Sequence, residues 1–132
     1  MMFKRHFKKH FTIDEARSHL PWLRKNLPEI QRIFKELQTV GFDVYNGKYK
    51  PGFNPDTLEP YPYQYRRFLN LVNQILDAGI QIKSIEAGLV DFPAIRSNGQ
   101  EVFLCWKLGE QDIYFWHEID GGFAGRQDIG TF

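Results

Sequence analysis

The sequence predicts a two-layer α+β fold, in which two antiparallel helices, the first one kinked, pack on a three- to four-stranded antiparallel β-meander. Apolar residues recur at spacings of three and four over residues 12–40 and 62–78, which is the period of an amphipathic helix. Apolar runs separated by turn residues follow over residues 80–119 and indicate strands. With 132 residues, the chain is long enough for one domain with its own core.

The first helix has a clear start and an interrupted middle. Thr12, followed three residues later by Glu15, forms the capping-box pattern of a helix N-terminus. Pro21 and Pro28 each remove a helical hydrogen bond, so we expect this helix to be kinked or broken. The second helix should end at Gly79, a residue type favoured just past a helix C-terminus. Residues 1–11 read as a flexible basic arm, and residues 12–132 as a single α+β domain.

The meander is predicted to have strands at residues 89–95, 101–108 and 112–119, with a short strand after Gly79 and an irregular tail over residues 120–132. Asn98-Gly99 is a strong hairpin signal, and we interpret it and Glu110-Gln111 as two-residue loops. Opposed residues then share a face. One face would carry Asp91, Trp106 and His117, and the other Cys105, Trp116 and Glu118.

This register has two consequences. Asp91 and His117 would lie two strands apart, too far for direct contact, so that a water molecule or a ligand would have to bridge them. Both faces are apolar enough to need cover. The helices cover one face, and the other needs the long loop at residues 41–60, the tail or a second subunit, which favours a homodimer.

Charge and cysteine content exclude several classes of protein. The net charge is +1, with 13 basic against 7 acidic residues up to residue 67 and 4 against 9 after it. This imbalance is too small for a dedicated nucleic-acid binder. Cys105 is the only cysteine, which excludes an internal disulfide and a multi-cysteine zinc cluster. A lone thiol, no secretory signal and no membrane-spanning run lead us to expect a cytoplasmic protein.

Three segments carry a family resemblance: GLVDFPAI (88–95), EVFLCWKLGE (101–110) and YFWHEIDGGFAGRQ (114–127). Together with FTIDEARSHLPWL at residues 11–23, they resemble the bacterial domain-of-unknown-function family 2203. The resemblance is specific in the last third and loose in the middle. It implies a cytoplasmic bacterial protein of helices and a short sheet, and it supplies no catalytic residues.

The candidate site residues lie in the last third. Asp91, His117 and Glu118 are candidate catalytic groups, because one imidazole and two carboxylates can support acid–base or metal-assisted chemistry. His117 and Glu118 point to opposite faces of a strand, and we predict no metal and no cofactor. Cys105 reads as a small buried hydrophobic residue. The candidate ligand-binding residues are Trp106, Trp116, Asp120 and Arg126, with Arg126 able to bind an anion or to pair with a nearby carboxylate.

The sequence favours a non-enzymatic binding or interaction module with a polar-aromatic recognition surface on the meander, for a protein or a small anionic ligand. A small hydrolase or lyase using His117, Asp91 and Glu118 is the alternative. A second alternative is a nucleic-acid-associated protein that uses the basic arm.

Overall fold

The capping box at Thr12 begins the first helical segment. In the computed structural model, which describes residues 5–55 and 58–132, the Thr12 side chain accepts from the Glu15 backbone N–H, and the Glu15 carboxylate accepts from the Thr12 N–H. Helix α1 (Ile13–Ser18) is followed after one residue, His19, by α2 (Leu20–Thr39). The predicted interruption is therefore a break at His19. Pro21 lies in the first turn of α2, where its missing N–H costs nothing, and α2 continues through Pro28, which does not break it.

Two small elements separate α2 from the next helix. Strands β1 (Phe42–Asp43) and β2 (Lys48–Tyr49) form a hairpin, and α3 (Gln64–Asp77) follows. Gly79 then takes a positive φ, and the N–H of Ile80 donates to the Ile75 carbonyl, which closes α3 as its sequence predicts.

The main sheet is antiparallel and five-stranded, in the order β3-β4-β5-β6-β7. Its strands are β3 (Gln81–Ser84), β4 (Leu89–Ile95), β5 (Glu101–Lys107), β6 (Phe115–Glu118) and β7 (Gln127–Asp128). Single-turn helices η1 (Phe123–Gly125) and η2 (Ile129–Thr131) flank β7. The α+β class is confirmed, with the tail adding a fifth strand.

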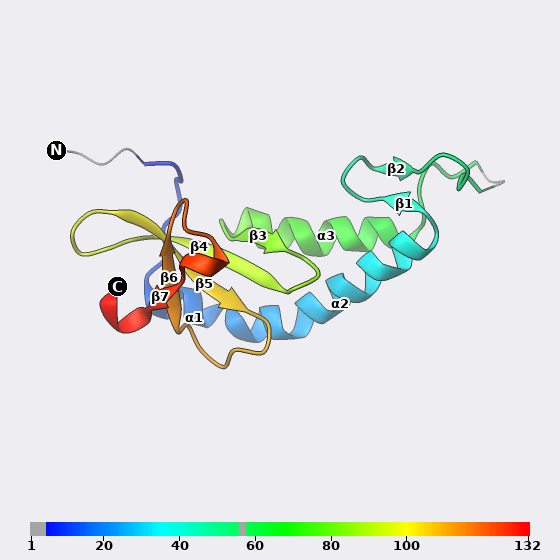
Figure 1. The fold of residues 1–132 in the computed structure, drawn as a ribbon. Coiled ribbons are helices and arrows are strands. Elements are labelled where there is room, and N and C mark those ends of the chain that lie inside the picture. Colours follow the sequence, from blue (N-terminus) through cyan, green and yellow to red (C-terminus); the bar gives the residue numbers. More distant parts are fainter. Residues whose placement is uncertain (1–4, 56–57) are drawn as a thin grey trace.

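Helices α2 and α3 run antiparallel to each other and extend beyond the sheet to one side, and the β1–β2 hairpin lies at their far end (Figure 1). The described part of the long loop therefore packs on the helices, as Phe42 does on Tyr65 of α3, and does not cover the sheet. Among the described residues, no helix has both the length and the apolar character needed to cross a bilayer.

The register of the sheet differs from the expected one. Ile95 pairs with Glu101, and Arg96 hydrogen-bonds Gln100, so the loop has three residues and ends in Gly99 at φ 90°. Asp91 consequently lies opposite Cys105, not Trp106. The connection from β5 to β6 is also longer than expected, and Cys105 lies opposite Phe115. The prediction that Trp106 shares a face with Asp91 was wrong.

The two faces of the sheet are covered by different parts of the chain. The first face is apolar, and its residues join the core with the helices: Val90, Phe92, Ala94, Val102, Leu104, Trp106 and Trp116. We call it the helix face. The second face carries Asp91, Phe103, Cys105, Phe115 and His117, and we call it the polar face.

The polar face is covered by the arm at Phe7 and by the tail, whereas Phe11 packs on Phe92 in the core of the helix face. Phe7 packs on Phe103 with ring centroids 5.2 Å apart, and Arg126 stacks on Phe115. The arm is anchored by Glu101, whose carboxylate accepts from the backbone N–H groups of His6 and Phe7 and contacts both His6 Nδ1 and His10 Nε2. Of the long loop, the tail and a second subunit, which the sequence offered as cover for this face, the tail is one that packs on it, together with the arm.

Candidate functional site

A buried cluster of Asp91, Cys105 and His117 lies on the polar face. Asp91 is 1% exposed, Cys105 0% and His117 2%. The three come from neighbouring strands, β4, β5 and β6, and one potential ligand atom from each lies within 4.8 Å of the others. No other group of this kind occurs in residues 5–55 and 58–132.

Asp91 and His117 are in direct contact, contrary to the expectation that they lie too far apart. His117 Nε2 is 3.0 Å from Asp91 Oδ2. The two strands are separated by β5, but the residue between them in the Asp91 row is Cys105, whose small side chain leaves room for the contact. Phe103, which lies opposite His117, packs beside the imidazole with ring centroids 5.4 Å apart.

The second ring nitrogen of His117 defines the orientation of the imidazole. Nδ1 is 2.7 Å from the Glu118 carbonyl oxygen, which can only accept, so Nδ1 carries a hydrogen. Nε2 therefore faces the cluster, either as the second donor of an imidazolium or as a lone pair. A backbone carbonyl on one nitrogen is the usual way in which a metal-binding histidine is oriented.

The protonation of the cluster follows from burial and hydrogen bonding. Burial lowers the pKa of His117, but hydrogen bonds to Asp91 and to the Glu118 carbonyl outweigh this and raise the pKa above its ordinary value. Burial raises the pKa of the Cys105 thiol to about 12, and the nearby Asp91 carboxylate adds to the rise. Without a metal, these shifts favour the charged imidazole of His117 in its contact with Asp91, beside a neutral Cys105 thiol.

This arrangement does not activate Cys105 as a nucleophile. A histidine that deprotonates a thiol needs a free nitrogen directed at sulfur. Both nitrogens of His117 are engaged, one by Asp91 and one by the Glu118 carbonyl. The raised pKa of the Cys105 thiol also indicates that this cysteine is not an activated nucleophile.

One atom of the cluster has no partner. Asp91 Oδ1 is buried and makes no hydrogen bond with any of the described residues. Buried polar atoms almost always have a partner, so an orphan of this kind calls for an explanation. It belongs to the same carboxylate that contacts His117 and lies opposite Cys105.

Arg126 closes one side of the polar face without entering the cluster. Its Nη2 donates to both carboxylate oxygens of Glu110, at 2.6 and 2.7 Å, and to the Cys105 carbonyl at 3.4 Å. The guanidinium carbon is 3.9 Å from the centroid of Phe115 and 4.8 Å from that of Phe123. Arg126 therefore forms an internal tie with Glu110, a partner that the sequence did not suggest.

The remaining candidates are not brought to the cluster. Trp106 and Trp116 are buried on the helix face, where their indole N–H groups donate to the Glu110 carbonyl and to Thr131 Oγ1. Neither contributes to an exposed recognition surface. Glu118 is exposed and contacts Gln100, and Asp120 is exposed in the turn after β6. Cys105, which reads from the sequence more naturally as a small buried hydrophobic residue than as a nucleophile, is the member of the cluster that was missed.

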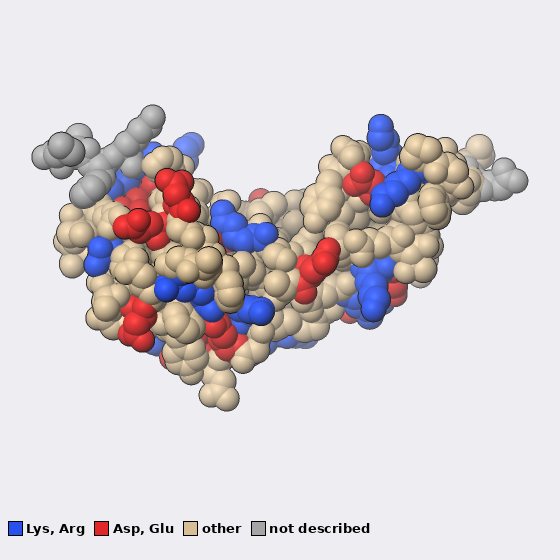
Figure 2. Space-filling view, in the orientation of Figure 1, with Lys and Arg blue, Asp and Glu red and all other residues tan. Residues whose placement is uncertain are grey.

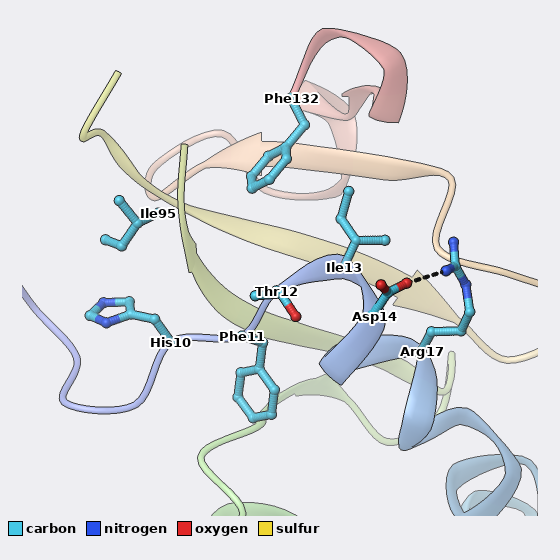
Figure 3. A pocket seen from close by; sticks show the side chains of 8 residues that line it. All are labelled: His10, Phe11, Thr12, Ile13, Asp14, Arg17, Ile95 and Phe132. Carbon is cyan, nitrogen blue, oxygen red and sulfur yellow. Dashed lines mark hydrogen bonds and ion pairs between the residues drawn. The ribbon is translucent and has the colours of Figure 1, made fainter. Parts of the chain in front are cut away.

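The pocket drawn in Figure 3 is separate from the cluster. It has a volume of about 490 Å³ and lies between α1, the end of β4 and Phe132. Its lining includes His10, Ile13 and Ile95, and none of Asp91, Cys105 or His117. The charged groups of its lining already have partners, Arg17 in Asp14 and Asp112 and His10 in Glu101, so the buried cluster is the stronger candidate for chemistry.

Comparisons with known proteins agree with the resemblance in the last third. Neither the curated proteins nor the solved structures contain a match to the chain. A family model described as "Uncharacterized conserved protein (DUF2203)" matches residues 9–129, which include α1, α2, α3 and all five strands of the main sheet. The chain therefore belongs to the DUF2203 family.

Proposed function

We propose that this domain is a metalloprotein that binds one divalent transition-metal ion, Zn²⁺ or a similar ion, through Asp91, Cys105 and His117. The observation that carries the proposal is the convergence of a carboxylate, a thiol and an oriented imidazole, all buried, within 4.8 Å of one another. Carboxylate oxygen, thiolate sulfur and imidazole nitrogen are the three ligand types that Zn²⁺ takes from proteins.

The dimensions of the cluster support this ion. Tetrahedral zinc with bonds of about 2.0 Å to nitrogen or oxygen and about 2.3 Å to sulfur places its ligand atoms roughly 3.3–3.6 Å apart. The Asp91–His117 separation of 3.0 Å lies just below this range, and the 4.8 Å limit of the cluster lies above it. Small side-chain rotations suffice to admit an ion.

A metal ion would also explain two features that an ion pair between Asp91 and His117 does not: the unpaired Oδ1 atom of Asp91 and the thiol of Cys105 beside the pair. It would replace the proton on Nε2 of His117 and give the unpaired Oδ1 atom of Asp91 a charged partner. It would remove the proton of Cys105, because a coordinated thiol is deprotonated. The Glu118 carbonyl would keep His117 oriented through Nδ1.

Three protein ligands leave a fourth coordination position for water or a small ligand, which is the pattern of catalytic rather than structural zinc sites. This favours the metal-assisted enzyme over a purely non-enzymatic binding module. Cys105, and not Glu118 as expected from the sequence, would be the third group beside Asp91 and His117. A cysteine ligand that must remain reduced is consistent with the cytoplasmic location that we propose for the protein.

The nucleic-acid alternative has less support. Lys4 lies outside the described residues. Several of the other basic side chains are engaged, such as Lys9 with Glu15 and Arg67 with Glu29. On the surface shown in Figure 2, acidic and basic side chains are interspersed, with no continuous basic patch.

The test is a titration of metal-free protein with Co²⁺ and Zn²⁺. Because Cys105 is the only cysteine, a sulfur-to-cobalt charge-transfer band reports on this residue alone. We expect one equivalent to bind and a rise in melting temperature with metal concentration. Asp91→Asn, Cys105→Ala and His117→Gln should each weaken binding, and Glu118→Gln, beside His117 but exposed, is the matched control. Absence of the band, or equal binding by Cys105→Ala, would refute the proposal.

A further inference from the structure

The cluster of Asp91, Cys105 and His117 is closed to solvent. All three residues are at most 2% exposed, and none of them lines the pocket of Figure 3. A metal ion that binds here therefore has to pass beneath part of the cover of the polar face. Two segments provide that cover. One is the arm, and the other is the loop of residues 120–126 between β6 and β7, which we call the tail loop.

The tail loop contacts the cluster directly. Gly121 lies against His117, so closely that a Cβ atom added to this glycine would be 3.5 Å from the Cβ of His117. Arg126 Nη2 donates to the Cys105 carbonyl at 3.4 Å. Two of the three cluster residues are thus in contact with this loop.

The arm is held by several contacts and lies further from the cluster. The buried Glu101 carboxylate accepts from the backbone N–H groups of His6 and Phe7 and contacts the rings of His6 and His10. The ring of Phe7 reaches the polar face at Phe103, which is not a member of the cluster. Displacing the arm would break all these contacts and would uncover Phe103 first.

The tail loop is held mainly by one side chain. Residues 120–124 are exposed, and the N–H groups of Gly121 and Gly125 donate to carbonyls within the loop or directly before it. The strongest attachment of the loop to the rest of the molecule is Arg126, whose guanidinium donates to both carboxylate oxygens of Glu110 at 2.6 and 2.7 Å. Breaking this one ion pair would free most of the loop.

Two further features favour opening at this place. Gly122 has φ 61° and ψ −170°, a conformation that essentially only glycine adopts, and a Cβ atom added to it would meet nothing within 4 Å. This glycine therefore has room to act as a hinge. The Nε atom of Arg126 is buried without a hydrogen-bond partner among the described residues, so the closed loop leaves a donor unpaired that water would satisfy on opening.

We infer that the tail loop is a gate through which the metal ion enters and leaves the cluster, and that the ion pair of Arg126 with Glu110 is its latch. The inference rests on the metal centre proposed above and adds the route by which that centre exchanges its ion. When the latch breaks, the loop turns about Gly122 and uncovers Cys105 and His117. The arm stays in place during this opening.

The test measures how fast N-ethylmaleimide modifies Cys105, the only thiol, in the metal-free full-length protein. This reagent is uncharged, so its encounter rate does not depend on the charges that the variants remove. We expect Glu110→Gln and Arg126→Met each to raise the modification rate about tenfold or more, because each removes charge-assisted hydrogen bonds of the latch. Low concentrations of denaturant should not change these rates, since the opening is local.

The two latch variants separate opening of the loop from a direct effect on the thiol. Glu110 raises the pKa of Cys105 and Arg126 lowers it, so an electrostatic effect alone would change the rate in opposite directions. Arg96→Met is the matched control. Arg96 also stacks on an aromatic residue of β6, Trp116, at 4.3 Å, and its replacement should leave the rate unchanged.

Unchanged or opposite rates in the two latch variants would overturn the inference. Equal acceleration by Glu101→Gln would also overturn it, because the arm would then be the route. With Co²⁺, both latch variants should bind and release the ion about tenfold faster than the wild type. Faster modification of Cys105 in a protein that binds no cobalt would instead count against the metal centre itself, so the two failures can be told apart.

Discussion

The two faces of the main sheet differ in what covers them and in what they bury. The buried side chains of the helix face are apolar, such as Phe92 and Leu104, and join the core with α2 and α3. The polar face buries an aspartate, a histidine and a thiol beneath a chain arm and a tail. The same strands supply both sets by simple alternation. The stability of the domain should therefore reside on one face and its chemistry on the other.

Leu104 and Cys105 are neighbours in β5 that point to opposite faces, and they provide the sharpest comparison. Leu104→Ala should lower the free energy of unfolding by about 2–5 kcal/mol, because it leaves a cavity in the apolar core. The folded fraction should still bind one metal ion. Chemical denaturation with and without Zn²⁺ measures both effects, and loss of metal binding by protein shown to be folded would break the division between the faces.

Glu101 tests what holds the cover of the polar face in place. Burial raises the pKa of its carboxyl, but hydrogen bonds from His10, from the backbone N–H groups of His6 and Phe7 and from the His6 ring lower it to about 2. Because this pKa is depressed, the stabilisation is complete above about pH 4.5 and is lost as the pH falls towards 2.

We expect Glu101→Gln to lower the free energy of unfolding by about 1–3 kcal/mol at pH 6, since hydrogen bonds to a charged group are lost. The difference from the wild type should shrink between pH 4.5 and 2, where the wild-type carboxylate is protonated. Denaturation curves at several pH values measure this. A difference independent of pH would show that the Glu101 charge does not anchor the arm.

Cys105→Ala should have the smallest effect on the metal-free protein. The substitution removes one sulfur atom from a neutral thiol, so we expect a loss of about 1 kcal/mol. The stabilisation by added Zn²⁺ should disappear, in contrast to Leu104→Ala. Thermal melts at matched metal concentrations make the comparison. A large loss without metal, with Zn²⁺ stabilisation intact, would make Cys105 a core residue and nothing more.

The helices and strands were predictable because their signals are local. The capping box at Thr12, the glycine at the end of α3 and the strands around Asn98-Gly99 all lie within a few residues of the structure that they specify. The break at His19 was predictable only as a kink or a break, because Pro21 is tolerated equally well in the first turn of a new helix.

The site was only partly predictable, because the loop between β4 and β5 has one residue more than expected. Asn-Gly occurs both in two-residue loops and in three-residue loops with glycine in the left-handed position, and this hairpin uses the second. The one-residue shift moved Cys105 to the face of Asp91. A second shift, between β5 and β6, cancelled the first for His117, so its placement with Asp91 was correct.

A signal for the correct register was present in the sequence. With a three-residue loop, one face of β4 and β5 becomes wholly apolar, from Val90 to Trp106, and the polar residues collect on the other. The expected register mixed Asp91 with the apolar set. The contact of Glu110 with Arg126 had no such signal, because it depends on the path of the seven-residue connection and of the tail.

X-ray absorption spectroscopy of the zinc-loaded protein tests the central claim most directly. We predict one sulfur neighbour at about 2.3 Å and nitrogen or oxygen neighbours at about 2.0 Å, four in all. The sulfur contribution should vanish in Cys105→Ala and persist in Glu118→Gln. A six-coordinate shell of oxygen and nitrogen without sulfur would show that zinc binds elsewhere, and that Asp91, Cys105 and His117 form a structural tie.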